Sequence, residues 1–143
     1  MRSTTATTTD RTSTTVAELS EALANAFRTG EVGDRFTDDV FLDGCPPRWR
    51  FQLQGLDAFE AWLRDYTRHQ PSVDVVHTTR TEHGFVTEQS SSEMTEDGEI
   101  TGRKILLCQV RDDRIAAMTV YCNGAWDEEL RARHAAEAPM IRP

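Results

Sequence analysis

The sequence has few of the residues that build cross-links or metal clusters. Its three cysteines, Cys45, Cys108 and Cys122, lie far apart and form no C-x-x-C pair, a spacing that predicts neither a disulfide framework nor a zinc site. Its four histidines show no H-x-x-x-H or HExxH spacing, and nucleotide-binding and nucleophile-elbow motifs are missing too. We therefore expect a protein that works without metal and without cofactor.

Basic residues are also scarce. Lysine and arginine total 16 against 24 acidic residues, for a formal net charge of -8, and Lys104 is the single lysine. An acidic chain is a poor partner for nucleic acid or an anionic membrane, because both require a basic face. No apolar run approaches the roughly 18–20 residues of a membrane span, and the N-terminus lacks the apolar stretch of a secretory signal. These absences predict a cytoplasmic protein that binds neither nucleic acid nor membrane.

The length of 143 residues suits one domain. Residues 1–13 are rich in threonine and serine, which predicts a flexible leader, followed by a domain over 14–138 and a tail over 139–143. A first helix is predicted from Thr14–Thr15 to Gly30. Thr15 and Glu18 have the spacing of a capping box, and apolar residues then recur at every third or fourth position.

After this helix the hydrophobic period changes along the chain. The pattern predicts a helical turn over 31–36, a hairpin of strands 39–43 and 48–54, a helix over 57–70, four strands over 72–82, 85–94, 102–111 and 115–123, and a helix over 126–138. Consecutive strands joined by short turns form an antiparallel meander. We predict an α+β fold: a cone-shaped barrel in which a curved antiparallel sheet wraps around three N-terminal helices, with a polar C-terminal helix.

Three short motifs carry a resemblance to a known superfamily. Residues 36–43 (FTDDVFLD), 55–59 (GLDAF) and 114–121 (RIAAMTVY) occur in the order that is typical of nuclear transport factor 2-like (NTF2-like) proteins. These include ketosteroid isomerases, limonene epoxide hydrolases and SnoaL-like polyketide cyclases, and the resemblance covers about residues 14–127. It implies a cone whose apolar interior binds small hydrophobic molecules, in a chain that forms a homodimer.

The catalytic residues of two of these families do not carry over. The positions of the isomerase base, tyrosine and aspartic acid hold Gly44, Leu23 and Leu106, and those of the epoxide hydrolase set hold Gln89, Ser91 and Val120. Asp43, one residue from the isomerase base position, can replace that base only if a bulge turns it inward. By elimination, the chain resembles the SnoaL-like group.

The same resemblance implies which side chains face the cone. The last two strands offer an almost wholly apolar set: Leu106, Cys108, Val110, Ala116, Met118, Val120 and Cys122. The strand before them offers Thr87, Gln89, Ser91 and Glu93, which face either the cone or water because no apolar residue fixes the register there. His77 is in step with Val73 and Val75, so it faces the cone if those valines do.

The sequence therefore predicts a cofactor-independent, SnoaL-like enzyme acting on a hydrophobic, oxygenated small molecule of polyketide type. The chemistry expected is acid/base cyclisation, dehydration or isomerisation, with His77, Asp43 and Glu93 as catalytic groups. The predicted substrate-binding residues are Trp62, Tyr66, Gln89, Ser91, Leu106, Met118, Val120 and Cys122. The alternative is a non-catalytic small-molecule-binding or dimerisation module of the same fold.

Overall fold

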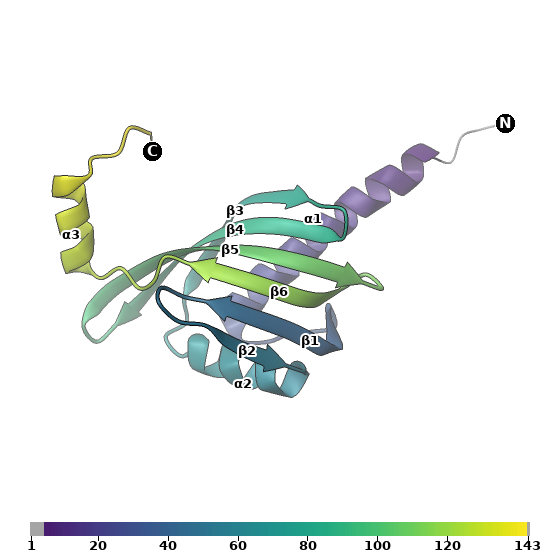
Figure 1. Ribbon diagram of the computed structural model, residues 1–143, viewed down its shortest axis with the longest axis horizontal. Coiled ribbons are helices and arrows are strands. Elements are labelled where there is room, and N and C mark those ends of the chain that lie inside the picture. The colour runs from purple at the N-terminus through teal and green to yellow at the C-terminus, as the bar shows by residue number, and fades with distance from the viewer. Residues whose placement is uncertain (1–4, 143) are drawn as a thin grey trace.

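The computed structural model describes residues 5–142, and their side chains from Thr15 onward. The elements, in chain order, are α1 (Thr5–Thr29), β1 (Phe36–Cys45), β2 (Phe51–Gln54), α2 (Leu56–Tyr66), β3 (Ser72–Arg80), β4 (Gly84–Thr95), β5 (Gly98–Arg111), β6 (Arg114–Cys122) and α3 (Glu128–Glu137). In Figure 1 the strands form one curved sheet, α1 and α2 lie on its far side, and α3 stands apart at one end. The α+β cone is thus confirmed.

The sheet is mixed, whereas an antiparallel sheet was predicted. Its strand order is β2-β1-β6-β5-β4-β3, and every pair is antiparallel except β1 with β6, which run parallel. Short turns hold consecutive strands antiparallel, but they do not constrain strands that are distant in the chain. Because β1 and β6 are separated in the chain by α2 and four strands, no short turn fixes their relative direction, and a parallel pair can form.

The N-terminal helices also differ from the prediction. Helix α1 begins at Thr5, ten residues before Thr15, because extending an existing helix requires no new nucleus. Residues 1–4 of the predicted leader lie outside the described residues. The turn predicted over 31–36 is not helical; Gly30 and Gly33 have φ angles of 79° and 61° there, which end the helix and turn the chain into β1. Two helices, not three, therefore precede the long strands within the described range.

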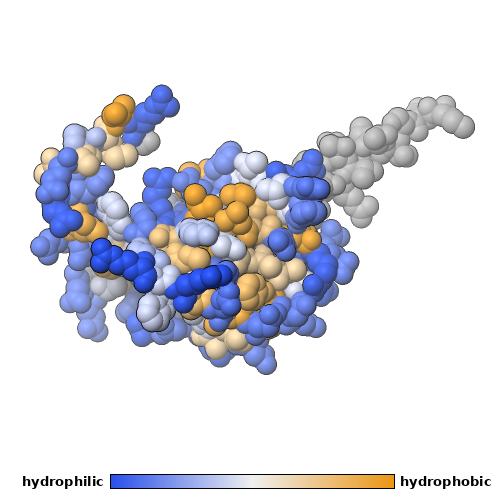
Figure 2. Space-filling view, in the orientation of Figure 1, coloured by the Kyte–Doolittle hydropathy of each residue, from blue (hydrophilic) through white to orange (hydrophobic). Residues whose placement is uncertain are grey.

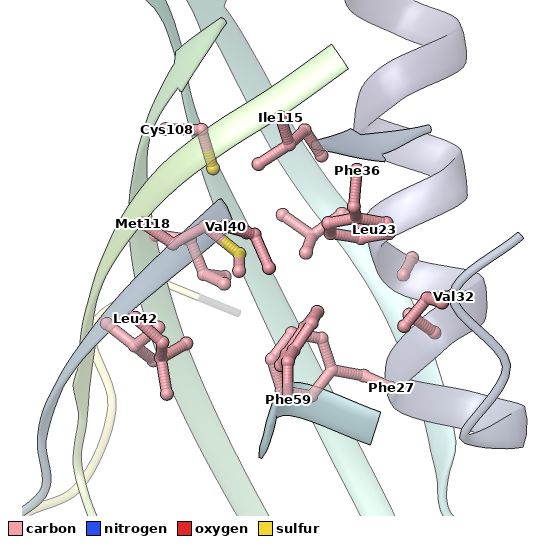
Figure 3. Packing of buried hydrophobic residues seen from close by; sticks show 14 of the residues in the cluster. Leu23, Phe27, Val32, Phe36, Val40, Leu42, Phe59, Cys108, Ile115 and Met118 are labelled. Atoms are coloured by element: carbon pink, nitrogen blue, oxygen red, sulfur yellow. The ribbon is translucent and has the colours of Figure 1, made fainter. Parts of the chain in front are cut away.

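The core lies between the helices and the concave face of the sheet. Leu19, Leu23 and Phe27 of α1 and Leu63 of α2 have no exposed surface. Figure 3 shows Leu23, Phe27 and Phe59 pointing from the two helices toward β-strand side chains that include Val40, Leu42 and Met118. This packing closes one end of the cone and leaves the side chains of the other end free to line a cavity.

Candidate functional site

A cavity of about 290 Å³ occupies the end of the cone where β1 and β6 finish and β5 begins. Its lining comes from both α1 and α2, the α2–β3 connection, five strands and the loops that follow β1 and β6: Phe27, Gly44, Cys45, Pro46, Phe51, Trp62, Tyr66, Pro71, Ser91, Glu93, Ile100, Thr101, Gly102, Arg103, Lys104, Val120, Cys122, Gly124 and Ala125. The volume lies at the lower end of the range for small-molecule sites, about 300–1,000 Å³. A ligand of one or two rings fits this space better than a steroid.

One wall of the cavity is a cluster of aromatic rings. Trp62 and Tyr66 are four residues apart on α2, so they share a helix face, and their rings stack with centroids 5.1 Å apart. The ring of Phe27 meets that of Tyr66 edge-on at 5.2 Å, and the ring of Phe51 lies 5.7 Å from that of Trp62. This wall is a set of packed aromatic rings, and it suits the flat carbon skeleton of a ligand.

Lys104 of β5 is the buried basic residue of this cavity. Its side chain is only 6 % exposed, and Nζ lies 3.7 Å from the centroid of the Phe27 ring. Burial lowers the pKa of this amine to about 7, because removal from water disfavours the charged form. Near neutral pH the amine therefore exists in both protonation states.

Tyr66 is the polar partner of this lysine. Nζ of Lys104 donates a hydrogen bond to the phenolic oxygen of Tyr66 at 2.7 Å, which leaves the Tyr66 hydroxyl hydrogen for another acceptor. Burial raises the pKa of Tyr66 to about 12, against the opposing effect of a hydrogen bond with Ser91. The phenol thus keeps its proton at neutral pH and can donate it to a ligand oxygen.

The polar row of β4, which comprises Thr87, Gln89, Ser91 and Glu93, faces the cone. The sequence alone left open whether these side chains face the cone or water. Thr87 and Gln89 are completely buried, and Ser91 and Glu93 line the cavity. Gln89 lies directly opposite Lys104 in the sheet register. Neither atom of its side-chain amide has a hydrogen-bond partner among the described groups.

The other predicted binding residues divide between cavity and core. Trp62, Tyr66, Ser91, Val120 and Cys122 line the cavity with Glu93. Leu106 and Met118 are 0 % and 1 % exposed and belong to the core cluster, away from the cavity surface. Both side chains point into the cone, as expected. They lie deeper in the cone, where the helices α1 and α2 already fill the space.

His77 lies on the outer face of β3, and not in the cone. Val75 pairs with Gln89 while His77 pairs with Glu88, so two residues of β3 oppose one of β4 at a β-bulge. The bulge shifts the alternation by one residue. His77 is therefore exposed, and its Nε2 hydrogen-bonds the Thr79 hydroxyl at 2.7 Å.

Asp43 also faces away from the cavity. Its carboxylate accepts two hydrogen bonds from the Arg50 guanidinium, at 2.9 and 2.8 Å. The hydrogen bonds from Arg50 lower the pKa of this carboxyl group, which is the reverse of what a general base in an apolar pocket needs. The inward position at this point of β1 belongs to Gly44, and β1 has no bulge here that would turn Asp43 inward.

Lys104 is the site residue that sequence reasoning missed. Two signals pointed to it. It is the single lysine of a chain with 16 basic residues, and it lies two positions before Leu106, whose inward parity was predicted. Extending that alternation by one step places Lys104 in the cone.

Two kinds of feature are absent from the described part of the chain. No helix there is long and apolar enough to cross a membrane. Among the described side chains, no three His, Cys, Asp or Glu residues are grouped so as to hold a metal ion.

Comparison with known proteins establishes the fold. No protein-family model matches the chain, and no curated protein is significantly similar to it. Among solved structures, an NTF2-like protein from Anabaena variabilis is 16% identical with a TM-score of 0.65, over 87% of this chain and 95% of that one. A hypothetical protein from Catenulispora acidiphila with a ketosteroid isomerase-like fold, solved in complex with trimethylamine, is 14% identical with a TM-score of 0.64, over 74% and 85%.

A third structure has a described activity. SalBIII, an epoxide hydrolase/cyclase-like enzyme with a role in pyran ring formation in the polyether salinomycin, is 12% identical with a TM-score of 0.61, over 77% of this chain and 97% of that one. The resemblance to NTF2-like proteins is thereby confirmed for the fold. At these low sequence identities the similar structures show only the fold. A function can be inferred only from the cavity of this chain.

Proposed function

We propose that this chain is a cofactor-independent enzyme that binds a small, hydrophobic, oxygenated molecule and transfers protons on it. The observation that carries the proposal is the 2.7 Å contact between Lys104 and Tyr66 at the inner end of an aromatic cavity. A mostly apolar pocket that converges on a few polar groups is the usual form of an enzyme site. The reaction class is isomerisation, cyclisation or dehydration next to a carbonyl group.

The two groups have complementary roles. The Tyr66 hydroxyl donates a hydrogen bond to the carbonyl oxygen, where negative charge develops. The neutral Lys104 amine takes a proton from the adjacent carbon, and the C–H electron pair moves into the enolate. The resulting ammonium then returns that proton to another atom of the same molecule. An amine with a pKa of about 7 is well matched to both halves of this cycle.

Glu93 is the carboxylate that this proposal retains from the sequence prediction. It lines the cavity and its charge contributes to the raised pKa of Tyr66. His77 and Asp43 are not part of the proposed machinery, since both face away from the cavity. SalBIII, which shares the fold, is described as acting in pyran ring formation, and this supports the cyclase possibility within the proposed class.

The first test is thermal unfolding in the presence of acetophenone, 1-tetralone and progesterone. A ligand at about 100 times its dissociation constant adds roughly 2.7 kcal/mol of stability, which raises the midpoint by several degrees in a domain of this size. We expect the one- and two-ring ketones to raise it and the steroid to leave it unchanged. A ketone that binds and is recovered unchanged, with no deuterium taken up from D2O, would identify the alternative, a binding module.

A matched pair of variants locates the binding. Cys122→Phe adds a ring to the cavity lining, whereas Thr119→Phe adds the same ring to the outer face of the same strand. Each variant is compared with its own ligand-free midpoint. We expect Cys122→Phe alone to abolish the shift. Equal shifts in both variants would place the ligand elsewhere and contradict the proposal.

A further inference from the structure

Lys104 is the only side-chain amine in the sequence, and the fold buries it among aromatic rings. Its Nζ lies 3.7 Å from the Phe27 ring centroid and 4.6 Å from that of Tyr66. It takes part in none of the ion pairs formed by the described residues. A lysine used only for structure normally has a carboxylate partner or extends to solvent; this one has neither and borders a cavity.

The setting makes the amine a nucleophile. An ordinary lysine with a pKa near 10.4 is almost entirely protonated at pH 7, and an ammonium group has no free electron pair. Burial lowers the pKa of Lys104 to about 7, so roughly half of the molecules carry a free amine at that pH. Desolvation in a hydrophobic pocket is one of the ways in which enzymes activate lysine for attack on carbonyl carbon.

A proton donor stands beside this nucleophile. The Tyr66 oxygen is 2.7 Å from Nζ, and the phenol retains its proton at neutral pH because its own pKa is raised to about 12. A carbonyl group whose carbon is in contact with Nζ brings its oxygen within reach of that hydroxyl. Nucleophile and acid are therefore placed on the two ends of one C=O bond.

We propose that Lys104 forms an imine with an aldehyde or ketone bound in this cavity. The proposal rests on the proposed function: it keeps the pocket and the carbonyl substrate class, and gives Lys104 a covalent role in place of a purely proton-transferring one. The imine, once protonated, withdraws electrons from the adjacent carbon more strongly than the carbonyl group does. Proton removal from that carbon becomes easier. Because Lys104 is then part of the imine, the Glu93 carboxylate, which lines the same cavity, takes that proton in its place.

The steps balance without an oxidant or reductant. The Nζ electron pair attacks the carbonyl carbon, the C=O π pair moves to oxygen, and that oxygen takes the Tyr66 proton. The nitrogen then loses a proton, which returns to Tyr66, and a carbinolamine remains. Tyr66 gives a second proton to the hydroxyl oxygen as the C–O bond breaks, water leaves, and the nitrogen electron pair forms the C=N bond of a protonated imine. Loss of the N–H proton back to Tyr66 gives the neutral imine. One amine and one carbonyl group give one imine and one water.

Reductive trapping tests this in the intact protein. The chain is incubated at pH 7 with benzaldehyde and sodium cyanoborohydride, which converts an imine into a stable benzylamine, and the site of the benzyl group is mapped by mass spectrometry. Only Lys104 and the α-amino group can react. We expect the benzyl group on Lys104 at a rate about 10²-fold or more above that of Nα-acetyl-lysine, in line with the larger fraction of free amine.

The urea-unfolded chain is the internal control, and Nα-acetyl-lysine trapped in parallel with and without urea gives the effect of urea on the reaction itself. Lys104 should lose its advantage in urea, because its lowered pKa depends on the fold. Equal trapping of Lys104 in folded and unfolded chains would contradict the proposal.

Three variants separate the imine from the proposed function. Lys104→Arg keeps the positive charge and Lys104→Met keeps the length, and both should lose the adduct; Tyr66→Phe keeps the amine and should slow trapping about tenfold or more. If the folded wild type binds acetophenone but carries benzyl groups only on the α-amino group, the imine is wrong and the proton-transfer function stands. If the wild type binds no ketone, the proposed function itself fails.

Discussion

At the scale of single residues, the unusual feature of the chain is a lysine that is more than nine-tenths inaccessible and has no acidic partner among the described residues. Burying such a group has a cost that depends on pH. The pKa of Lys104 falls from 10.5 to about 7 on folding. Each unit of difference between the folded and unfolded pKa corresponds to about 1.36 kcal/mol, so the destabilisation reaches a few kcal/mol at acid pH.

The direction of the pH dependence follows from proton binding. Below pH 7 both states hold the proton and the folded state bears the full cost. Between about pH 7 and 10 the unfolded chain keeps the proton while the folded chain has lost it, so the free energy of unfolding rises with pH. We expect the wild type to gain about 2–3 kcal/mol relative to Lys104→Met between pH 7.5 and 9.5.

Urea unfolding of both proteins at several pH values measures this difference. Subtracting the variant from the wild type removes the contributions of other titrating groups, such as Cys108, whose thiol pKa is raised by burial. Lys104→Met should be the more stable protein at pH 6. Parallel curves for the two proteins would mean that Lys104 does not titrate differently in the folded state.

At the scale of elements, one irregularity in β3 decides which residues belong to the site. The bulge between Val75 and His77 carries His77 to the outer face, although the residues before it alternate regularly. We therefore expect the His77→Ala variant to bind acetophenone as the wild type does. It should also exchange the methyl hydrogens of acetophenone with solvent at the wild-type rate, within about twofold. Tyr66→Phe should reduce the same exchange by about 10²–10³-fold, the usual effect of removing a hydrogen bond to a developing oxyanion.

The variants Asp43→Asn and Glu93→Gln test the two predicted catalytic carboxylates in the same way. NMR of acetophenone in D2O measures the exchange of its methyl hydrogens for deuterium. Asp43 is held by Arg50 on the outer face, so its variant should behave like His77→Ala, whereas Glu93→Gln changes the charge next to Tyr66. Loss of exchange in His77→Ala with the fold intact would contradict the assignment of the site to Lys104 and Tyr66.

The same irregularity marks the limit of what the sequence predicts. The order and type of the long elements follow from the hydrophobic period, and the inward direction of Val120 and Cys122 was implied by the resemblance to NTF2-like proteins. A bulge has no hydrophobic signature in residues 75–78, so the position of His77 could not be derived. The parallel pairing of β1 with β6 is likewise set by packing between distant segments. Lys104, by contrast, was within reach, because β5 is regular from Lys104 to Gln109.

At the scale of the whole molecule, the outer face of the sheet exposes large apolar side chains. Ile105, Leu107 and Tyr121 are between 45% and 55% exposed, and Ile105 and Tyr121 are direct neighbours across β5 and β6. Figure 2 shows apolar residues gathered over the middle of this face. Contiguous apolar patches of this kind commonly mark protein interfaces, which supports the homodimer that the sequence resemblance implies.

The dimer prediction has a matched pair of substitutions. Leu107→Asp places a charge in the centre of the apolar patch, and Met94→Asp places the same charge at an exposed position near the far end of β4. A charge buried without a partner costs several kcal/mol, so Leu107→Asp should weaken self-association by 10²-fold or more while Met94→Asp leaves it intact. Sedimentation velocity over a dilution series measures both. A wild type that is monomeric at every concentration would contradict the prediction, and the exposed face would then need another partner.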